Sequence, residues 1–157
     1  MPALQIATPP KVYTKVNPGW SATVTRLVVF KTDSKHIFGV VKNAKHATDA
    51  IPRELRAGDL ILLQVTVQSA RSTAPQIEHA MTFVRCYEDL TGESDRIWGR
   101  HWRYIVEGKD AYRLKNPFDM RRVNKSGSNY GQGAIKFVYV HPLDEEAIRG
   151  GGYLEPK

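Results

Sequence analysis

Cysteine is nearly absent from this 157-residue chain. The single thiol, Cys86, cannot form an internal disulfide and has no CxxC companion for zinc, and its apolar neighbours Phe83 and Val84 predict that it is buried. Long hydrophobic runs are also missing, since no apolar stretch approaches the roughly 18 residues of a membrane span. The start, MPALQIATPP, has no charged region leading into an apolar stretch. We therefore expect a cytoplasmic protein without cysteine chemistry.

Metal-ligand spacing is a further absence. The five histidines, at positions 36, 46, 79, 101 and 141, form no HxxxH or similar pattern, and no carboxylate pair stands where a metal would need it. The glycines of SGSNYGQG lack the Lys-Ser/Thr of a phosphate-binding loop. We expect neither a metal nor another cofactor.

Positive charge is what the sequence has in excess. It contains 23 Lys and Arg against 16 Asp and Glu, a formal net charge of +7, with 41% hydrophobic and 25% charged residues. The hydrophobic and charged fractions are those of an ordinary globular domain, whereas the charge exceeds what solubility requires. It indicates a polyanionic partner, either nucleic acid or an anionic membrane surface.

Residues 1–20 contain four prolines without helical periodicity, so we expect an extended N-terminal arm before a single domain at 21–157. Apolar and β-branched runs predict strands, of which LVVF at 27–30 is typical of one buried on both faces. The expected strands are 21–31, 60–67, 76–88, 102–107, 111–114 and 134–140, with a hairpin between the second and third, a turn at Gly108 and a stop at Asn116 and Pro117.

Helical signals are short. Asp33 and Ser34 predict a short helix or turn followed by a loop over 33–47, Pro52 begins a helical turn, and the glycines after PLDEEAIR end a helix over 142–152. The expected fold class is α+β, with five to six short strands in a small, strongly curved mixed sheet or open barrel and short helices at its edges.

The segment RIWGRHWRYIV, residues 96–106, holds two of the three tryptophans. Gly99 and the WRYIV ending predict a turn entering a strand, with Trp98, Arg100 and Trp102 on one side. The indoles either belong to the core or form a stacking wall for a planar base. The interleaved arginines favour the stacking wall, because a purely structural aromatic cluster needs no cations around it.

Residues 121–133, RRVNKSGSNYGQG, are basic and almost free of aliphatic side chains. We expect a mobile loop outside the core, either a basic flap over nucleic acid or a solvated loop. An acid–base site is another open alternative, because a metal-independent ribonuclease could use His36 or His101 with a nearby Lys and leave little local signature.

The order of these segments resembles the PUA-like superfamily, specifically its EVE and YTH-type branch. LVVFK, FGVVKN, GDLILL, IEHAMTFVRCYE and IWGRHWRYIV carry the resemblance over about residues 21–142. It implies a PUA-like curved β-barrel with flanking helices and a pocket that accepts a flipped, often methylated, base in an aromatic cage. In YTH-type members one cage tryptophan follows the first helix, where this chain has the valine of GVVK, and Trp98 matches the second cage position.

We therefore expect a non-enzymatic nucleic-acid reader, with DNA or RNA as partner, no membrane, and another subunit supplying any catalysis. The alternatives are a small RNA-cleaving or RNA-modifying enzyme on the same fold, and an interaction subunit that uses the tryptophan face as a hot spot. The candidate base-binding residues are Trp98, Trp102, Tyr104, Val40, Val41, Asn43, Asp33 and Trp20. The candidate phosphate-binding residues are Arg96, Arg100, Arg103, Lys42, Arg121, Arg122 and Lys125.

Overall fold

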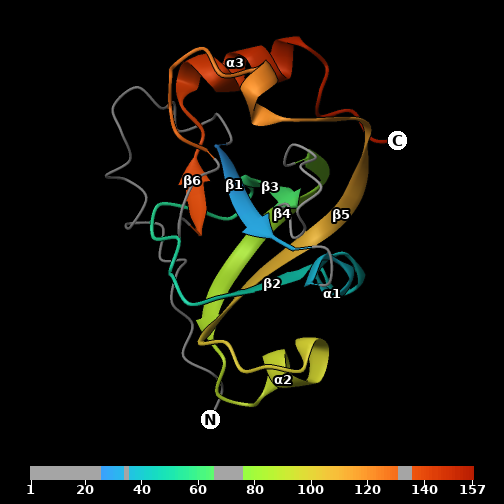
Figure 1. Ribbon diagram of the computed structural model, residues 1–157. Helices are drawn as coiled ribbons and strands as arrows, with labels where there is room; N and C mark the ends of the chain where they lie inside the picture. Colours follow the sequence, from blue (N-terminus) through green and yellow to red (C-terminus); the bar gives the residue numbers. More distant parts are fainter. Residues whose placement is uncertain (1–25, 34–35, 66–75, 131–135) are drawn as a thin grey trace, which may run out of the picture.

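A computed structural model describes residues 26–33, 36–65, 76–130 and 136–157. Within them, a curled six-stranded sheet forms a half-barrel with short helices around it (Figure 1). This confirms the expected α+β fold class of a curved mixed sheet with flanking helices. The proposed N-terminal arm and Trp20 lie outside the described residues. The elements are β1 Leu27–Thr32, α1 His36–Asn43, β2 Lys45–Thr48, β3 Leu60–Val65, β4 Gln76–Glu88, α2 Glu93–Trp98, β5 Tyr104–Phe118, the 3₁₀ turn η2 Met120–Arg122, β6 Phe137–Tyr139 and α3 Pro142–Gly150.

The strands lie in the order β2-β5-β4-β3-β1-β6. β1 and β3 are parallel, with Leu27 opposite Leu60, and the other neighbouring pairs are antiparallel. The expected pairing of β3 with β4 is confirmed, since Leu62 lies opposite Ala80. Gly58 and Asp59 form the turn before β3, where the buried Asp59 carboxylate accepts hydrogen bonds from the backbone N–H groups of Arg26 and Arg56.

Alternate residues of the strands point to opposite faces of the sheet and form two separate cores. On one face, Val28 and Phe30 of β1 pack with the buried side of α1. On the other face, Leu27 and Val29 pack with η2 and α3, including Ile148. The continuous LVVF run is therefore buried on both faces, as its composition predicts. Cys86 is buried in the first core, and burial raises the pKa of its thiol to about 12.

β5 differs from the expected strands, because 102–107 and 111–114 belong to one strand of 15 residues. The predicted turn at Gly108 and the stop at Asn116 and Pro117 were wrong. Gly108 pairs with Phe83 of β4, and a Cβ at Gly108 would lie 2.9 Å from the Thr82 carbonyl oxygen, so glycine permits close approach of the two chains. Register shifts along β4 absorb the irregular residues without ending the pairing.

Two further expectations were wrong. The loop predicted after the first helix contains β2, an edge strand in which Lys45 lies opposite Glu107 of β5. The basic segment 121–133 was expected outside the core, yet Val123 and Tyr130 are buried beneath the sheet's second face. No described helix is long and apolar enough to cross a membrane.

Candidate nucleic-acid interface

The tryptophan segment begins with a helix, α2, where a turn was expected. Asp89, at the end of β4, accepts hydrogen bonds from the backbone N–H groups of Thr91, Glu93 and Ser94 and from the Ser94 hydroxyl. Although burial acts to raise its pKa, these hydrogen bonds outweigh burial and hold the pKa of Asp89 below its ordinary value. Asp89 thus anchors the first turn of α2 as an ionised carboxylate.

α2 ends at Trp98, because Gly99 adopts a left-handed conformation with φ of 73°. Trp102 lies beyond the helix, before β5. Its backbone N–H donates to the Ser94 hydroxyl at 2.9 Å, so the fully buried Ser94 connects Asp89 to Trp102. The predicted alternation of a strand over residues 98–102 was wrong, but the fold still brings both indoles to one place.

Trp98 joins α2 to α1. Its half-buried indole donates from Nε1 to the carbonyl oxygen of His36 at 2.9 Å, and the two rings stack with centroids 4.4 Å apart. The ring lies on Gly39, where a Cβ would come within 2.4 Å of the indole nitrogen. Trp98 also packs against the first core, so this indole has a structural role between the helices.

Trp102 is placed differently. The exposed Arg100 lies over its ring, with the guanidinium carbon 3.9 Å from the ring centroid. The ring of His36 meets it edge-on at 5.6 Å. The Trp102 indole nitrogen is buried and has no hydrogen-bond partner among the described residues. One ring face of Trp102 is thus covered by an exposed side chain that a ligand could displace.

Two buried histidines complete what we call the aromatic cluster: His36, His46, Trp98 and Trp102. The His36 and His46 rings meet edge-on at 5.0 Å, and His46 meets Phe30 at 5.3 Å. Burial lowers the pKa of His36 to about 4 and that of His46 to about 3, so both are neutral at pH 7. His36 Nε2 and His46 Nδ1 have no hydrogen-bond partner among the described residues. A neutral imidazole can offer both a donor and an acceptor to a ligand.

The sequence did not identify His46 as a site residue. It belongs to β2, whose four residues KHAT carry little strand signal, and its place depends on pairing with β5. The sequence identified His36 only as a candidate acid or base of a ribonuclease. Its contact with Trp98 bridges 62 residues of sequence, so no local pattern could predict it.

The other candidate base-binding residues take different positions. Val40 and Tyr104 lie in the core and offer no surface to a ligand, and Val41 packs against that core. Asp33 accepts from the backbone N–H of His36 and so caps α1, as its sequence predicts. The exposed Asn43 donates from its amide to the Gly39 carbonyl.

Four candidate phosphate-binding residues lie on the segments that surround the cluster. Lys42 is exposed in the last turn of α1, and Arg96 donates to the Thr91 carbonyl from α2. Arg100 covers Trp102, and the exposed Arg103 lies 5.2 Å from the ring centroid of Tyr104. These residues could supply a cationic border to the aromatic cluster.

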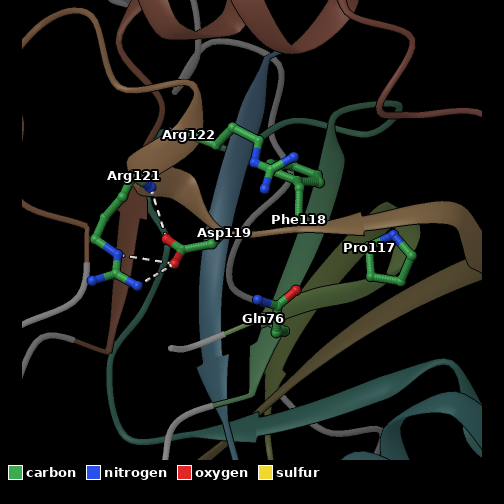
Figure 2. Close-up of a pocket in the computed structure, with 6 residues that line it drawn as sticks. All are labelled: Gln76, Pro117, Phe118, Asp119, Arg121 and Arg122. Carbon is green, nitrogen blue, oxygen red and sulfur yellow. Dashed lines mark hydrogen bonds and ion pairs between the residues drawn. The ribbon is translucent and has the colours of Figure 1, made fainter. Parts of the chain in front are cut away.

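The remaining three candidates lie elsewhere. η2 and the segment after it cover the second face of the sheet, near α3, whereas α1 and α2 adjoin the first face, and Figure 1 shows α2 and α3 at opposite ends of the molecule. Arg121 donates two hydrogen bonds to the Asp119 carboxylate beside an open hollow of about 480 Å³, which Arg122 also lines (Figure 2). The backbone N–H of Lys125 donates to the buried Asp144 of α3.

Across the described ranges, no group of three His, Cys, Asp or Glu side chains is arranged to hold a metal ion. The aromatic cluster itself offers aromatic rings and neutral imidazoles, with cations around it. Stacking, hydrogen bonding to a planar edge and binding of phosphate are the interactions that these groups provide.

No protein-family model and no curated protein matches the sequence. Solved structures do match the fold. An ASCH protein from Zymomonas mobilis aligns with a TM-score of 0.59 at 10% identity, over 79% of this chain and 94% of that one. A hypothetical protein from Leishmania major aligns at 0.55 and 11% identity, over 84% and 97% of the two chains.

A third match is the YTH domain of Zygosaccharomyces rouxii MRB1, determined in complex with N6-methyladenosine RNA. It has a TM-score of 0.51 and 14% identity, and the alignment covers 90% of this chain and 97% of that domain. At these identities the similarity establishes the fold alone. The chain shares its fold with the ASCH protein and the YTH domain, in agreement with the curved barrel that its sequence resemblance implies; the EVE or YTH-type branch does not follow from this similarity.

Proposed function

We propose that this protein is a nucleic-acid reader of the EVE or YTH type, which binds single-stranded RNA or DNA and takes one flipped base at the aromatic cluster. The observation that carries the proposal is the ring of Trp102, whose face is covered by the exposed Arg100 at 3.9 Å. A base that displaces or slides beneath this guanidinium gains a stacking partner and a cation together.

Recognition of the base edge falls to three nitrogen atoms that have no hydrogen-bond partner among the described residues. They are buried, so a base reaches them only when the cluster opens, beginning with displacement of Arg100. Trp102 Nε1, His36 Nε2 and His46 Nδ1 lie in one cluster of touching rings. Flipping a base costs a few kcal/mol, which stacking, edge hydrogen bonds and phosphate contacts must together offset. The cluster and its cationic border offer all three.

The structural similarity supports the proposal, because one protein of this fold has been seen with N6-methyladenosine RNA. In this chain Trp98 is hydrogen-bonded to and stacked on His36 of α1. We therefore assign the stacking wall to Trp102 and a supporting role to Trp98. A methyl group on the base would lie well against the indole and imidazole rings of such a site.

A small RNA-cleaving enzyme is the competing function, with His36 or His101 as acid or base. Acid–base cleavage near neutral pH needs groups whose pKa lies close to the working pH. Burial lowers the pKa of His36 to about 4, and a group with that pKa is a weak base and is deprotonated at pH 7. Burial therefore makes His36 poorly suited to this role, whereas His101 stays a candidate for it.

The test measures the affinity of the parent protein and of Trp102→Ala for single-stranded RNA and DNA, each with adenine or N6-methyladenine in the centre. Trp102→Ala should weaken binding by about 1–3 kcal/mol, and Trp102→Phe should retain most of the affinity. The same mixtures, carried to long incubation, report cleavage. Unchanged affinity in Trp102→Ala would exclude the stacking wall, and cleavage lost in His36→Ala or His101→Ala would establish the enzyme instead.

A further inference from the structure

Phe38 is the most exposed of the large hydrophobic side chains in the described part of the chain, at 76%. It lies in the first turn of α1, whose buried residues His36, Ile37 and Val40 already attach the helix to the core. Its ring therefore contributes little to the fold, and water covers most of it. An exposed aromatic ring on a basic protein is a candidate binding group.

The neighbours of Phe38 on α1 give its surroundings. Lys42 follows four residues later and is exposed on the same side of the helix. At 100° per residue, Gly39 lies about a quarter of a turn around the helix from Phe38, and Asn43 lies about as far from Lys42. Gly39 is the residue on which Trp98 rests. Phe38 thus lies about a quarter of a turn around α1 from the point where Trp98 of the aromatic cluster contacts the helix, with a cation beside it.

We propose that Phe38 and Lys42 form a second stacking position for the same nucleic-acid strand: the base next to the one held at the aromatic cluster stacks on Phe38, and Lys42 binds its phosphate. This rests on the proposed function and adds the path of the strand, across α1. The pairing of ring and ammonium favours a nucleotide over an apolar protein segment, because it matches both base and phosphate. Neither Asp nor Glu occurs in α1 to repel the phosphate.

The experiment titrates the full-length protein with a single-stranded RNA of about nine nucleotides, a length within the site sizes of single-strand binders. Phe38→Ala should raise Kd by about 5- to 150-fold, which corresponds to the 1–3 kcal/mol of one stacked base. Phe38→Trp should bind at least as tightly as the parent. Lys42→Gln should make the slope of log affinity against log salt shallower by about 0.7. Because these side chains are exposed, the variants should fold as the parent does.

Phe38→Leu separates stacking from apolar docking, since leucine keeps the hydrophobic surface and removes the ring. Affinity should fall with Phe38→Leu, whereas Leu143→Ala, a matched exposed site on α3 with 52% exposure, should leave it unchanged. If Trp102→Ala weakens binding while Phe38→Ala stays within twofold of the parent, this inference is overturned and the proposed function stands. A parent protein that binds no oligonucleotide overturns both, whereas a Phe38→Ala variant altered only in self-association overturns this inference alone.

Discussion

Trp98 and His36 are joined by two interactions, a hydrogen bond and a ring stack. The indole nitrogen donates to the His36 carbonyl, and the rings stack with their planes 2° from parallel. Because this contact attaches α2 to α1 and to the core, Trp98→Ala should lower the free energy of unfolding by about 2–4 kcal/mol, measured by urea denaturation. Trp98→Phe should lower it by about 1–2 kcal/mol. Trp102→Ala should lower the free energy of unfolding by less than Trp98→Ala does, because the Trp102 ring does not join the two helices. A larger loss of stability in Trp102→Ala would contradict the structural role of Trp98.

Acid should weaken the fold through the buried histidines. The pKa of His46 is about 3 and that of His36 about 4 in the folded protein, against 6.5 for an exposed imidazole. Below pH 6.5 the unfolded chain binds protons that the folded chain does not, so stability is full above that pH and falls toward about pH 4. The slope should reach about 1.4 kcal/mol per pH unit for each histidine. The stability of His46→Phe should fall less steeply with decreasing pH than that of the parent.

Glycine should be needed at position 39 because the Trp98 indole packs against it, and not because of the conformation of α1. Alanine at an exposed helix position normally stabilises by about 1 kcal/mol relative to glycine. Here its Cβ would meet the Trp98 indole nitrogen at 2.4 Å, so Gly39→Ala should destabilise by about 1–3 kcal/mol. In a Trp98→Ala background the same change should become neutral or stabilising. A double-mutant cycle by urea denaturation measures this reversal, and additive effects would show that the contact is not limiting.

Ser94 should hold Trp102 in place for binding. Its hydroxyl donates to Asp89 and accepts from the Trp102 N–H, and it is fully buried. Ser94→Ala leaves that N–H without its partner and should cost about 1–3 kcal/mol of stability. It should also weaken oligonucleotide binding at temperatures where the variant is folded. Full affinity in a folded Ser94→Ala would show that the loop needs no such anchor.

Salt dependence should separate the two basic surfaces. Arg100 and Arg103 lie beside the aromatic cluster, whereas Arg121 and Arg122 lie by the hollow on the other face of the sheet. Replacing Arg100 and Arg103 by Ala should make the slope of log affinity against log salt shallower by about 0.7 for each lost phosphate contact. Arg121→Ala and Arg122→Ala should change it less, since Asp119 already pairs with Arg121. A larger effect at Arg121 and Arg122 would move the phosphate path to the second face.

Those parts of the fold that depend on local pattern were predictable. The LVVF run, the turn at Gly58 and the helix over 142–150 each follow from residues that are neighbours in sequence. β5 was not predictable in this way, because Gly108 and Asn116 normally interrupt a strand. Its pairing with β4 carries it through both positions, aided by register shifts in the ladder.

The candidate site was predictable only in part. The two tryptophans and their arginines were visible as one segment, but the sequence did not separate the indole held between α1 and α2 from the indole covered by Arg100. That difference depends on His36 and Gly39, which α1 brings from 62 and 59 positions away, and on β2, which gains its identity from β5. The basic residues 121 and 122 resembled the others in sequence, and only the topology separates them.

The position of β1 has a consequence for biosynthesis. β1 pairs with β3 on one side and with β6 on the other, where Phe30 lies opposite Phe137. The two partners emerge from the ribosome far apart in time, so a nascent chain that has formed the β1–β3–β4 sheet still lacks the β6 neighbour of its most apolar strand. Such an edge is prone to pairing with other chains. Chains that end before residue 137 should therefore bind chaperones or aggregate. This should occur even though such chains already contain all four residues of the aromatic cluster.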